Sequence, residues 1–491
     1  MITKGVAYNP MNGHLTADMT VLSYEVAKMQ SGSNHWSSSE NNRNNGRNVN
    51  FSNGNTNNNN KYNSNVVRPV AAFLDYPPND FISSVWEAYN DCLCGKMRSE
   101  GAIEYMQIAD HDIPCLAYEL WTGTYSPGTS TCFLVRYPKW REVFAAGFRD
   151  RIVHHWVCLR LNPLFEERFI SQGDVSFNCR KGLGTDKAVE HVANIMEKVS
   201  DHYHRPAWVF RGDLVGFFMS IDKNLLWEKL CGFTLRWRRI QEREGWKRIY
   251  DKGIVGTMPN MYWDILIRTT KTIVMHHPEK DCILNTKPHL WKNMDTNKSL
   301  FTSPTGEPIG NLTTQLFANF LMSFFVEYIQ NLYRGRNWGM AQFVDDFIIV
   351  CDDLDFLTAS IPQIESFLKQ ELCQTMHHDK RYLQPVSHGV LFVGTFIKPG
   401  RFYLSNRTLA RMKEKCTGFG KALSNGQMSA YDLLHIEQVI NSYLGFCRRR
   451  KTYKFRREFL ALLGLSFWKY FYIKGHYESI RTKKKYQPIA N

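Results

Sequence analysis

The run FVDDFIIV, residues 343–350, is the most informative stretch of the chain. Two adjacent acids, Asp345 and Asp346, interrupt residues that are otherwise apolar and typical of buried strands. Neighbouring side chains of a straight strand face opposite sides, so both carboxylates can reach one site only at a tight bend. The run therefore predicts two short strands joined by a hairpin whose tip offers carboxylates to a divalent metal ion. An ordinary Asp-rich turn is the alternative interpretation.

A two-metal site needs a further carboxylate from a separate element, because the two ions lie about 3.5–4 Å apart. The best candidate is Asp213, which ends the apolar, strand-like segment 208–213 and is followed by the aromatic pair Phe217 and Phe218. A turn or cap residue is the alternative for Asp213. The acids at 352, 353 and 355 are instead expected to cap the helix that follows them.

Charge is concentrated near the end of the chain. The 491 residues carry 61 Lys and Arg against 46 Asp and Glu, a net charge of +15. Residues 401–491 contain 19 basic and 5 acidic residues, so nearly all of the excess lies there. This predicts a dedicated polyanion-binding element. A hydrophobic content of 43% excludes a wholly disordered chain.

The cysteines and the apolar stretches predict a cytoplasmic protein that contacts no membrane. The 12 cysteines are scattered and form no CxxC pair, as expected of reduced intracellular thiols. The N-terminus lacks the apolar run of a signal peptide. The most apolar stretch, 316–326, contains Asn319 and follows several polar residues, which favours a buried helix over a membrane span.

The remaining elements alternate between strand and helix in the middle of the chain, and helices dominate its end. Asn occupies 14 of the 25 residues 41–65, so this block is expected to be solvated loop or disorder. Pro163 is expected to stop a helix over 151–161. The other predicted helices cover 81–96, 225–250, 355–372 and a stretch after Ser429, and the predicted strands cover 132–135 and parts of 390–404. In the last of these helices Ser429 is the expected N-cap, and one face carries Leu433, Ile436, Ile440, Tyr443 and Leu444.

Asp213 with Phe218, the segment GEPIGNLTTQ (306–315) and FVDD (343–346) follow one another along the chain. In this order they resemble motifs A, B and C of reverse transcriptases, and the resemblance covers roughly residues 72–450. FRDRIVHH (148–155) and CRKGLGT (179–185) resemble the first two fingers motifs of the family, and HDK (378–380) and FVG (392–394) resemble motifs D and E. One departure is Phe343, where the family more often has Tyr.

The resemblance implies a role for each matching residue. It implies that Asp213, Asp345 and Asp346 bind two Mg²⁺ ions, with Mn²⁺ as a substitute, and that Lys380 gives a proton to pyrophosphate. It makes Phe218 the steric gate against a ribose 2′-hydroxyl. It places Arg149 and Arg151 on the dNTP triphosphate, and Arg180 on template or triphosphate. It also makes Ile309, Gly310 and Gln315 dNTP-binding residues. A core position for Phe218 and a surface position for Arg149 are the alternatives, and His154 and His155 are expected to be structural.

Motif B points to a subfamily. Most reverse transcriptases have Gln-Gly followed by Ser-Pro, whereas this chain has Ile309-Gly310 and Thr314-Gln315. That pattern resembles the enzymes of diversity-generating retroelements, which misincorporate opposite template adenines, although Thr314 departs from their usual Ser. An aliphatic Ile309 cannot hydrogen-bond the nascent base pair as an amide would. The Asn-rich block resembles a translated template repeat of such elements; a flexible linker is the alternative.

The basic C-terminal region resembles the thumb that grips the template–primer duplex. Cations alternate with aromatics there, a pattern that suits phosphates and exposed bases. The candidate nucleic-acid ligands are Arg448, Arg449, Arg450, Lys451, Lys454, Arg456 and Arg457. The resemblance also implies a template RNA, a DNA or RNA primer, dNTPs and a small basic accessory protein as partners.

We therefore expect an α/β right-hand polymerase with fingers, a ferredoxin-like palm and a helical thumb. The expected divisions are an uncertain segment 1–35, the Asn-rich segment 36–71, fingers and palm over 72–400, and thumb and tail over 401–491. The expected activity is RNA-directed DNA polymerisation that is error-prone at adenines and diversifies a variable gene. The alternatives are a retron-like or phage-defence reverse transcriptase and a non-catalytic RNA-binding module.

Overall fold

The computed structural model describes residues 76–136, 139–294, 299–302, 304–426, 428–448, 450 and 452–487, together with the backbone of four short strands nearer the N-terminus. The chain forms two compact units. Unit 1 comprises Met1–Leu164, Lys223–Ser303 and Pro308–Thr314, and unit 2 comprises Phe165–Asp222, Pro304–Glu307 and Gln315–Asn491. The expected boundary at residue 400 lies within unit 2.

The Asn-rich block contains paired strands, where a loop was expected. The strands are β1 (Asn34–Glu40), β2 (Asn45–Asn50), β3 (Thr56–Asn60) and β4 (Val66–Val67), in the order β3-β2-β1-β4. Backbone hydrogen bonding does not depend on side-chain polarity, so even a polar run can pair in this way. The prediction of loop or disorder over 41–65 was therefore wrong for β2 and β3, the two strands that lie within that range.

Unit 1 combines helices with a small three-stranded sheet. The sheet has the order β6-β5-β8, from β5 (Ser130–Val135), β6 (Arg141–Ala145) and β8 (Cys282–Leu284). The helices are α3 (Asn79–Leu93), α4 (Glu100–Met106), α5 (Ala109–Thr122), α9 (Lys223–Glu244), α10 (Lys247–Asp251) and α11 (Trp263–Met275). Short 3-10 helices follow at Pro278–Lys280 and Pro288–Asn293.

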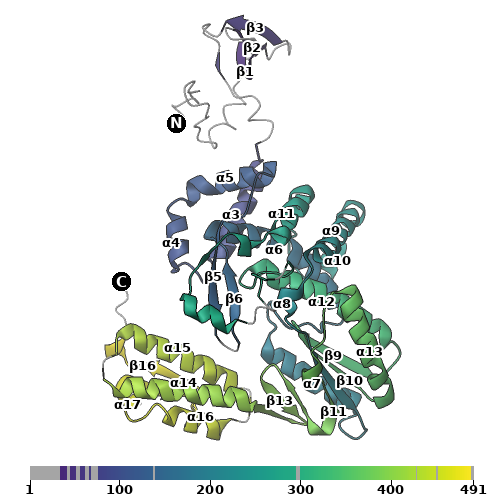
Figure 1. Ribbon diagram of the computed structural model, residues 1–491, viewed down its shortest axis with the longest axis vertical. Helices are drawn as coiled ribbons and strands as arrows, with labels where there is room; N and C mark the ends of the chain where they lie inside the picture. Colours follow the sequence, from purple (N-terminus) through teal and green to yellow (C-terminus); the bar gives the residue numbers. More distant parts are fainter. Residues whose placement is uncertain are drawn as a thin grey trace. The chain divides into compact units, whose positions relative to one another are not determined.

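The main sheet of unit 2 is four-stranded and antiparallel throughout. Its strands are β7 (Trp208–Asp213), β9 (Trp338–Phe343), β10 (Asp346–Cys351) and β11 (Tyr382–Pro385), in the order β11-β7-β10-β9. Helix α13 (Leu354–Glu371) lies between β10 and β11 in the chain and beside the sheet in Figure 1. Taking the strands in chain order, the spatial order is fourth, first, third, second. This ferredoxin-like order confirms the expected palm sheet and the mixed α/β class.

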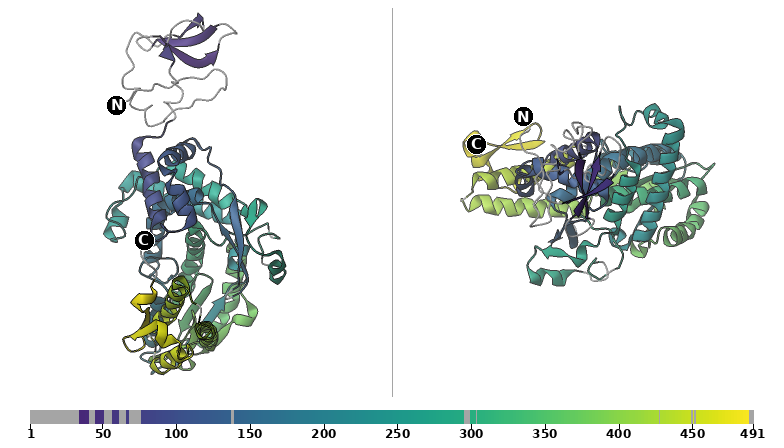
Figure 2. Two further views of the ribbon diagram at one scale, coloured as in Figure 1. Left: turned by 90° about the vertical axis from the view of Figure 1, so that its left-hand side faces the viewer. Right: turned by 90° about the horizontal axis from the view of Figure 1, so that it is seen from above.

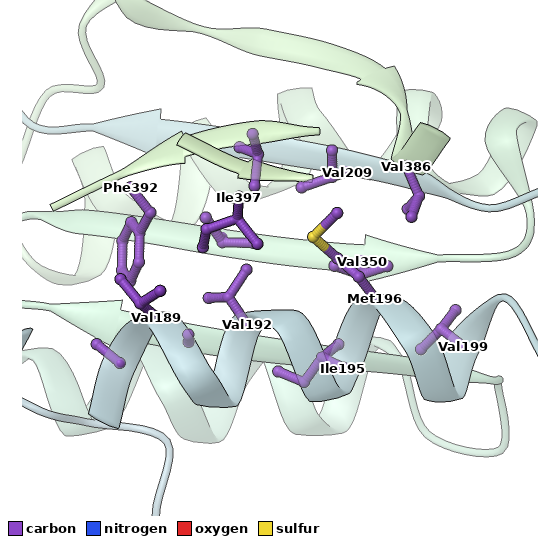
Figure 3. Packing of buried hydrophobic residues seen from close by; sticks show 14 of the residues in the cluster. Val189, Val192, Ile195, Met196, Val199, Val209, Val350, Val386, Phe392 and Ile397 are labelled. Atoms are coloured by element: carbon purple, nitrogen blue, oxygen red, sulfur yellow. The ribbon is translucent and has the colours of Figure 1, made fainter. Parts of the chain in front are cut away.

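The core of unit 2 joins this sheet to one helix. Val189, Val192, Met196 and Val199 of α7 (Thr185–Val199) point toward the sheet in Figure 3. Val209 of β7 and Val350 of β10 meet them, and Phe392 and Ile397 close the cluster from a second sheet. That sheet has the order β12-β13-β14, from Val390–Phe392, Thr395–Lys398 and Arg401–Leu404. The cluster fixes the strands from one face of the sheet.

The C-terminal elements form a helical bundle with a two-stranded sheet, as expected (yellow-green and yellow in Figure 2). They are α14 (Asn406–Ser424), α15 (Ala430–Cys447), α16 (Tyr453–Ala461), α17 (Phe467–Tyr470), β15 (Phe471–Lys474) and β16 (Ser479–Thr482). Ser429 caps α15 in a capping box with Asp432, which confirms the predicted N-cap. Leu433, Ile436, Ile440 and Leu444 are buried on the predicted face.

Two long helices settle further predictions. Helix α6 (Phe148–Ser171) continues through Pro163, so the predicted stop was wrong. Leu161, Leu164, Phe165 and Phe169 are buried on both sides of the proline, and their packing offsets the one lost hydrogen bond. Helix α12 (Leu312–Leu332) contains the apolar stretch and is largely buried, as predicted. No helix among the described residues is long and apolar enough to cross a bilayer.

Candidate active site

The two acids of the FVDD run lie at a hairpin tip, as predicted. Strand β9 ends at Phe343 and β10 begins at Asp346, so Val344 and Asp345 form a two-residue turn. Val344 has φ of 58°. A positive φ is costly for a β-branched residue, and a turn with positive φ at its first central position ordinarily takes glycine. Backbone strain of this kind is typical of functional sites.

Asp213 lies directly opposite Asp346. The two residues form the last register pair between β7 and β10. Directly opposed residues of an antiparallel pair place their side chains on the same face of the sheet, with Cβ atoms about 4.5–5.5 Å apart. Two acids that are 133 residues apart in the sequence are therefore neighbours, and Asp345 is the next residue in the chain. The predicted convergence of the hairpin tip with the end of strand 208–213 is confirmed.

Each opposed carboxylate is held by a cation. Arg211 donates Nε to Asp346 Oδ1 at 2.9 Å and Nη2 to Asp346 Oδ2 at 3.0 Å. Lys380 Nζ donates to Asp213 Oδ2. Like charges on directly opposed residues repel, so these cations stabilise the pair. Burial nevertheless raises the pKa of Asp346 above its ordinary value, and the neighbouring Asp213 adds to the increase, while Arg211 opposes it.

The segment carrying Lys380 is attached to the strand of Asp213 by backbone hydrogen bonds. His377 N donates to Asp213 O at 2.7 Å, and Val215 N donates to Thr375 O at 2.8 Å. The 3-10 turn His378–Lys380 follows at once. This pairing places the lysine beside the carboxylates, as the resemblance of HDK to motif D implies.

The donor set suits Mg²⁺ in chemistry, but the described residues do not complete a metal cage. Mg²⁺ prefers oxygen ligands and commonly uses one or two carboxylates together with substrate phosphates. Asp213, Asp345 and Asp346 provide such oxygens at one tip. Among the described residues, however, no three His, Cys, Asp or Glu side chains are grouped closely enough to hold a metal ion. Lys380 Nζ donates to Oδ2 of Asp213, so an ion that binds through this oxygen has to displace the ammonium group.

Gly212 supports the site from the other face of the sheet. A Cβ added there would lie 2.4 Å from the Phe347 ring. Phe347 is fully buried and packs edge-on against Phe325 at a centroid distance of 4.8 Å. Glycine therefore lets the strand of Asp213 lie flat on this ring. Neither Gly212 nor Arg211 was predicted from the sequence, although both lie within two residues of Asp213.

The steric-gate candidate follows the strand on a short helix. Phe218 belongs to α8 (Phe217–Ser220) and is half-buried, with its ring edge-on to Phe217 at 5.3 Å. Its carbonyl accepts a hydrogen bond from Glu307 N at 2.8 Å. The side chain is therefore neither fully in the core nor fully exposed. This position leaves the proposed role of Phe218 possible and untested.

Motif B divides between the two units. In unit 1, Phe144 N donates to Ile309 O at 2.7 Å, and a Cβ added at Gly310, whose φ is 131°, would lie 2.5 Å from Phe144 O. The positive φ and the close approach of the Phe144 carbonyl are therefore sufficient to require glycine at position 310. In unit 2, Gln315 is exposed and its Oε1 accepts from Cys179 Sγ at 2.9 Å. The roles predicted for Ile309, Gly310 and Gln315 in dNTP binding stay predictions.

The two fingers arginines already have partners in unit 1. Arg149 donates Nη1 and Nη2 to Glu119 at 2.7 and 2.9 Å, and Nε to Asp112 at 2.8 Å. A triphosphate would have to displace both carboxylates from Arg149. Arg151 donates Nε to Ala146 O at 2.8 Å. The triphosphate role predicted for these residues stays a prediction, and the contacts of Arg149 do not support it.

Arg180 is a structural residue in this fold. Its side chain is 4% exposed and pairs with Glu166 at 2.7 Å and with Asp174 at 2.6 Å. Its Nη1 donates to Ser176 O at 2.7 Å. Because Glu166, Asp174 and Ser176 O already accept from the Arg180 guanidinium, Arg180 cannot contact a template without breaking these interactions. We therefore correct the interpretation of Arg180 as a nucleic-acid ligand.

The C-terminal cations fall into two groups. Arg450 is buried and donates to Thr395 and Asp186, and Arg456 is buried and donates to Tyr477 O. Both hold the fold together, which corrects their assignment as nucleic-acid ligands. Arg448, Lys454 and Arg457 are exposed and remain candidates. Arg449 and Lys451 lie outside the described residues.

The two motif histidines are structural, as expected. His154 Nδ1 lies 2.7 Å from Thr313 Oγ1, and His155 Nδ1 lies 2.6 Å from Asp91 Oδ2. Burial lowers the pKa of His154 to about 3 and also lowers the pKa of His155. The predicted cap of α13 is confirmed as well, because Asp353 accepts from Phe356 N at 2.9 Å.

No family model matches the chain, and no curated protein sequence matches it. Among solved structures, similar ones include apo telomerase from Candida tropicalis, with 13% identity, a TM-score of 0.40 and coverage of 70% of this chain and 57% of that one. A second is Candida tropicalis telomerase truncated from its C-terminal domain, with 13% identity, a TM-score of 0.39 and coverage of 56% and 55%. A third is Candida albicans telomerase in complex with a fragment of telomeric RNA, with 11% identity, a TM-score of 0.38 and coverage of 68% and 58%.

The chain thus spans a little over half the length of these telomerases. Identities and TM-scores this low carry no argument about activity. What the chain does has to be argued from its own strand topology and its own carboxylates.

Proposed function

We propose that the chain is an RNA-directed DNA polymerase. The observation that carries this proposal is the register pair of Asp213 and Asp346 at the end of a ferredoxin-like sheet, with Asp345 on the adjoining turn. A primer 3′-hydroxyl would attack the α-phosphate of a dNTP, and pyrophosphate would leave. When bound, two Mg²⁺ ions would lower the pKa of the attacking hydroxyl and neutralise charge on the leaving group.

The residues around the tip have distinct roles in this proposal. Asp213, Asp345 and Asp346 would hold the ions, with Mn²⁺ as a substitute, while Arg211 orients Asp346 through its two hydrogen bonds. Lys380 gives a proton to the leaving pyrophosphate once it has left Asp213. Phe218 excludes a ribose 2′-hydroxyl. A non-catalytic RNA-binding module would not need opposed acids or a strained turn at their meeting point.

Primer extension tests the activity. Purified protein is given an RNA template, an annealed DNA primer, dNTPs and Mg²⁺. We expect elongated DNA from the wild type and a loss of at least about a thousandfold with Asp345→Ala, since the electrostatic stabilisation of the transferring phosphate is lost. Asp353→Ala, which removes the cap of α13 and an ion pair with Arg336 outside the site, is the matched control and should keep activity. Extension by Asp345→Ala at the wild-type rate would refute the proposal.

We further propose that the enzyme is of the diversity-generating type and makes errors at template adenines. Ile309 and Gln315 support this proposal, because they stand where most reverse transcriptases have the Gln of Gln-Gly and the Pro of Ser-Pro. Restoring an amide with Ile309→Gln should lower adenine errors, and sequencing of the cDNA products measures this. An unchanged error spectrum would contradict the role of Ile309 and leave a retron-like or phage-defence enzyme as the better assignment.

The proposed partners follow from this assignment. They are a template-repeat RNA, a primer, dNTPs and a small basic accessory protein, and the product would diversify a variable protein gene. The gene's own nucleotide sequence offers a simple check. A second near-copy of the segment encoding the Asn-rich block, differing mainly at adenines, is expected nearby, and its absence would contradict the subtype.

A further inference from the structure

Helix α9 of unit 1 presents a stripe of arginines away from its buried side. Its buried positions are Lys223, Leu226, Leu230, Thr234, Trp237 and Ile240. Arg236, Arg239 and Arg243 are all exposed. At 100° per residue they fall within an arc of about 60° that excludes every buried position, and they span about 10 Å of the helix. Lys247, the first residue of α10, adds a fourth exposed cation.

These four residues, the basic stripe, are not neutralised by the acids around them. Arg236, Arg239 and Lys247 make no ion pair with any residue that the structure describes. Arg243 only approaches Glu244, at 3.9 Å. The local acids pair instead with Arg238 on another flank of the helix, where Asp264 lies at 2.8 Å and Glu242 at 3.1 Å. The pairing pattern therefore leaves a one-sided positive surface.

Neither helix stability nor general basicity accounts for the stripe. Cations favour the last turn of a helix because of its dipole, which explains Arg243 but not Arg236, two turns further in. The first 400 residues are close to charge balance, yet residues 223–252 contain nine basic and four acidic residues. An excess concentrated on one helix is the usual footprint of a polyanion site.

Aromatic packing holds the helix and the turn after it in place. Trp237, Trp246 and Trp263 form a row with centroid distances of 6.4 and 6.0 Å. The Arg248 guanidinium lies over the Trp237 ring at 5.5 Å. The row connects α9, the α9–α10 turn and α11. The cations of the stripe therefore sit on a rigid support, which lowers the entropic cost of binding.

We propose that the basic stripe binds the phosphate backbone of the template RNA, as a second contact separate from the carboxylate tip. This inference rests on the proposed function, which supplies the RNA. Phosphate contacts by Arg and Lys give affinity without reading sequence. The exposed residues of α9 include no large apolar side chain, whereas a helix that lies on a membrane needs an exposed apolar face beside its cations.

Salt-dependent binding tests the site. The triple variant Arg236→Gln, Arg239→Gln and Lys247→Gln is compared with the wild type by fluorescence anisotropy, using fluorescein-labelled RNA annealed to a DNA primer. Each lost phosphate contact should reduce the slope of log affinity against log salt by about 0.7–0.9. We expect a reduction of about 2–3 and at least a tenfold loss of affinity near 0.1 M salt.

The control is a triple variant with the same change in charge, Lys187→Gln, Arg205→Gln and Lys369→Gln, all at exposed positions of unit 2. It should keep the wild-type slope. Equal slope changes in both triples, or none in either, would overturn the proposal. So would loss of binding to anionic phosphatidylserine vesicles by the stripe variant with RNA affinity unchanged.

Primer extension at saturating template separates this inference from the proposed function. The stripe variant should still extend a primer, because its carboxylates are intact. If the wild type binds RNA through the stripe but extends no primer, the polymerase proposal fails while the binding site stands. If the wild type extends primers and the stripe variant binds like the wild type, only the present inference fails.

Discussion

At the scale of single residues, the opposed acids depend on Arg211. The side chains of Arg211 and Asp346 are only 14% and 20% exposed, and the two share two hydrogen bonds. Removing the arginine leaves an uncompensated carboxylate opposite Asp213, which in a partly buried site costs about 2 kcal/mol. A divalent cation can replace the lost charge.

Arg211→Gln should therefore lower the thermal unfolding midpoint in EDTA, and Mg²⁺ should raise the midpoint of the variant more than that of the wild type. Differential scanning calorimetry with and without Mg²⁺ measures both effects. The control is Arg336→Gln, whose partner Asp353 is half exposed and lies outside the site. The same response to Mg²⁺ in Arg211→Gln and wild type would show that Arg211 does not compensate a cation site.

Gly212 offers a test of backbone packing under the site. Gly212→Ala would place a methyl group 2.4 Å from the Phe347 ring, which is fully buried and cannot move aside freely. Overpacking of this kind costs about 1–3 kcal/mol. Gly232 of α9 has no atom within 4 Å of its added Cβ, so Gly232→Ala should instead stabilise by up to about 1 kcal/mol. Urea unfolding measures the change in the free energy of unfolding for both variants, and equal changes would refute this account of Gly212.

Sequence reasoning worked best where a residue type carries its own signal. Paired acids in an apolar run predicted the hairpin and its meeting with Asp213, because strand geometry leaves few other arrangements. Arg211 was missed because an arginine inside a strand has no distinctive pattern. Its position two residues before Asp213, and so on the same face, was the available clue. Arg180, Arg450 and Arg456 were misassigned because charge alone does not tell a buried network from an exposed surface.

At the scale of elements, helix α6 shows how packing overrides local propensity. Pro163 predicted a helix end, but the buried side chains on both sides carry the helix on to Ser171. The Asn-rich strands differ from prediction for a related reason, since backbone pairing is open to residues with little apolar surface. By contrast, the caps at Ser429 and Asp353 were predicted correctly, because capping depends on a few adjacent residues.

The contact between His154 of α6 and Thr313 of α12 predicts a dependence of stability on pH. The folded-state pKa of His154 is about 3, whereas an unfolded histidine titrates near 6.5. Between these values the unfolded chain binds a proton that the folded chain does not. The free energy of unfolding should therefore fall as the pH falls through this window, by up to about 1.4 kcal/mol per pH unit from this group.

Urea unfolding of wild type and His154→Gln at several pH values isolates that contribution. The amide can keep a hydrogen bond to Thr313 and does not titrate, so the variant should lose less stability on acidification. The other histidines with lowered pKa, including His155, are common to both proteins and cancel in the comparison. Parallel pH profiles for the two proteins would contradict the buried, neutral state of His154.

At the scale of the whole molecule, the order of the motifs along the chain does not coincide with the division into compact units. The sequence motifs predicted fingers and palm over 72–400, and within this range the compact units separate residues 223–303 from the palm strands that flank them in sequence. The order of the motifs indicates which residues contribute to one active site, whereas the compact units show which residues pack together. The ferredoxin-like strand order was predictable because it follows from the motifs, whereas the division into units depends on long-range packing.

The central claim is that Asp213 and Asp346, opposed at the hairpin tip, hold a divalent ion. Mn²⁺ binding, followed by electron paramagnetic resonance with template–primer and dNTP present, tests it most directly. The account predicts tight Mn²⁺ binding by the wild type and at least tenfold weaker binding by Asp213→Asn, with Asp353→Asn like the wild type. Wild-type affinity for Mn²⁺ in Asp213→Asn would contradict it.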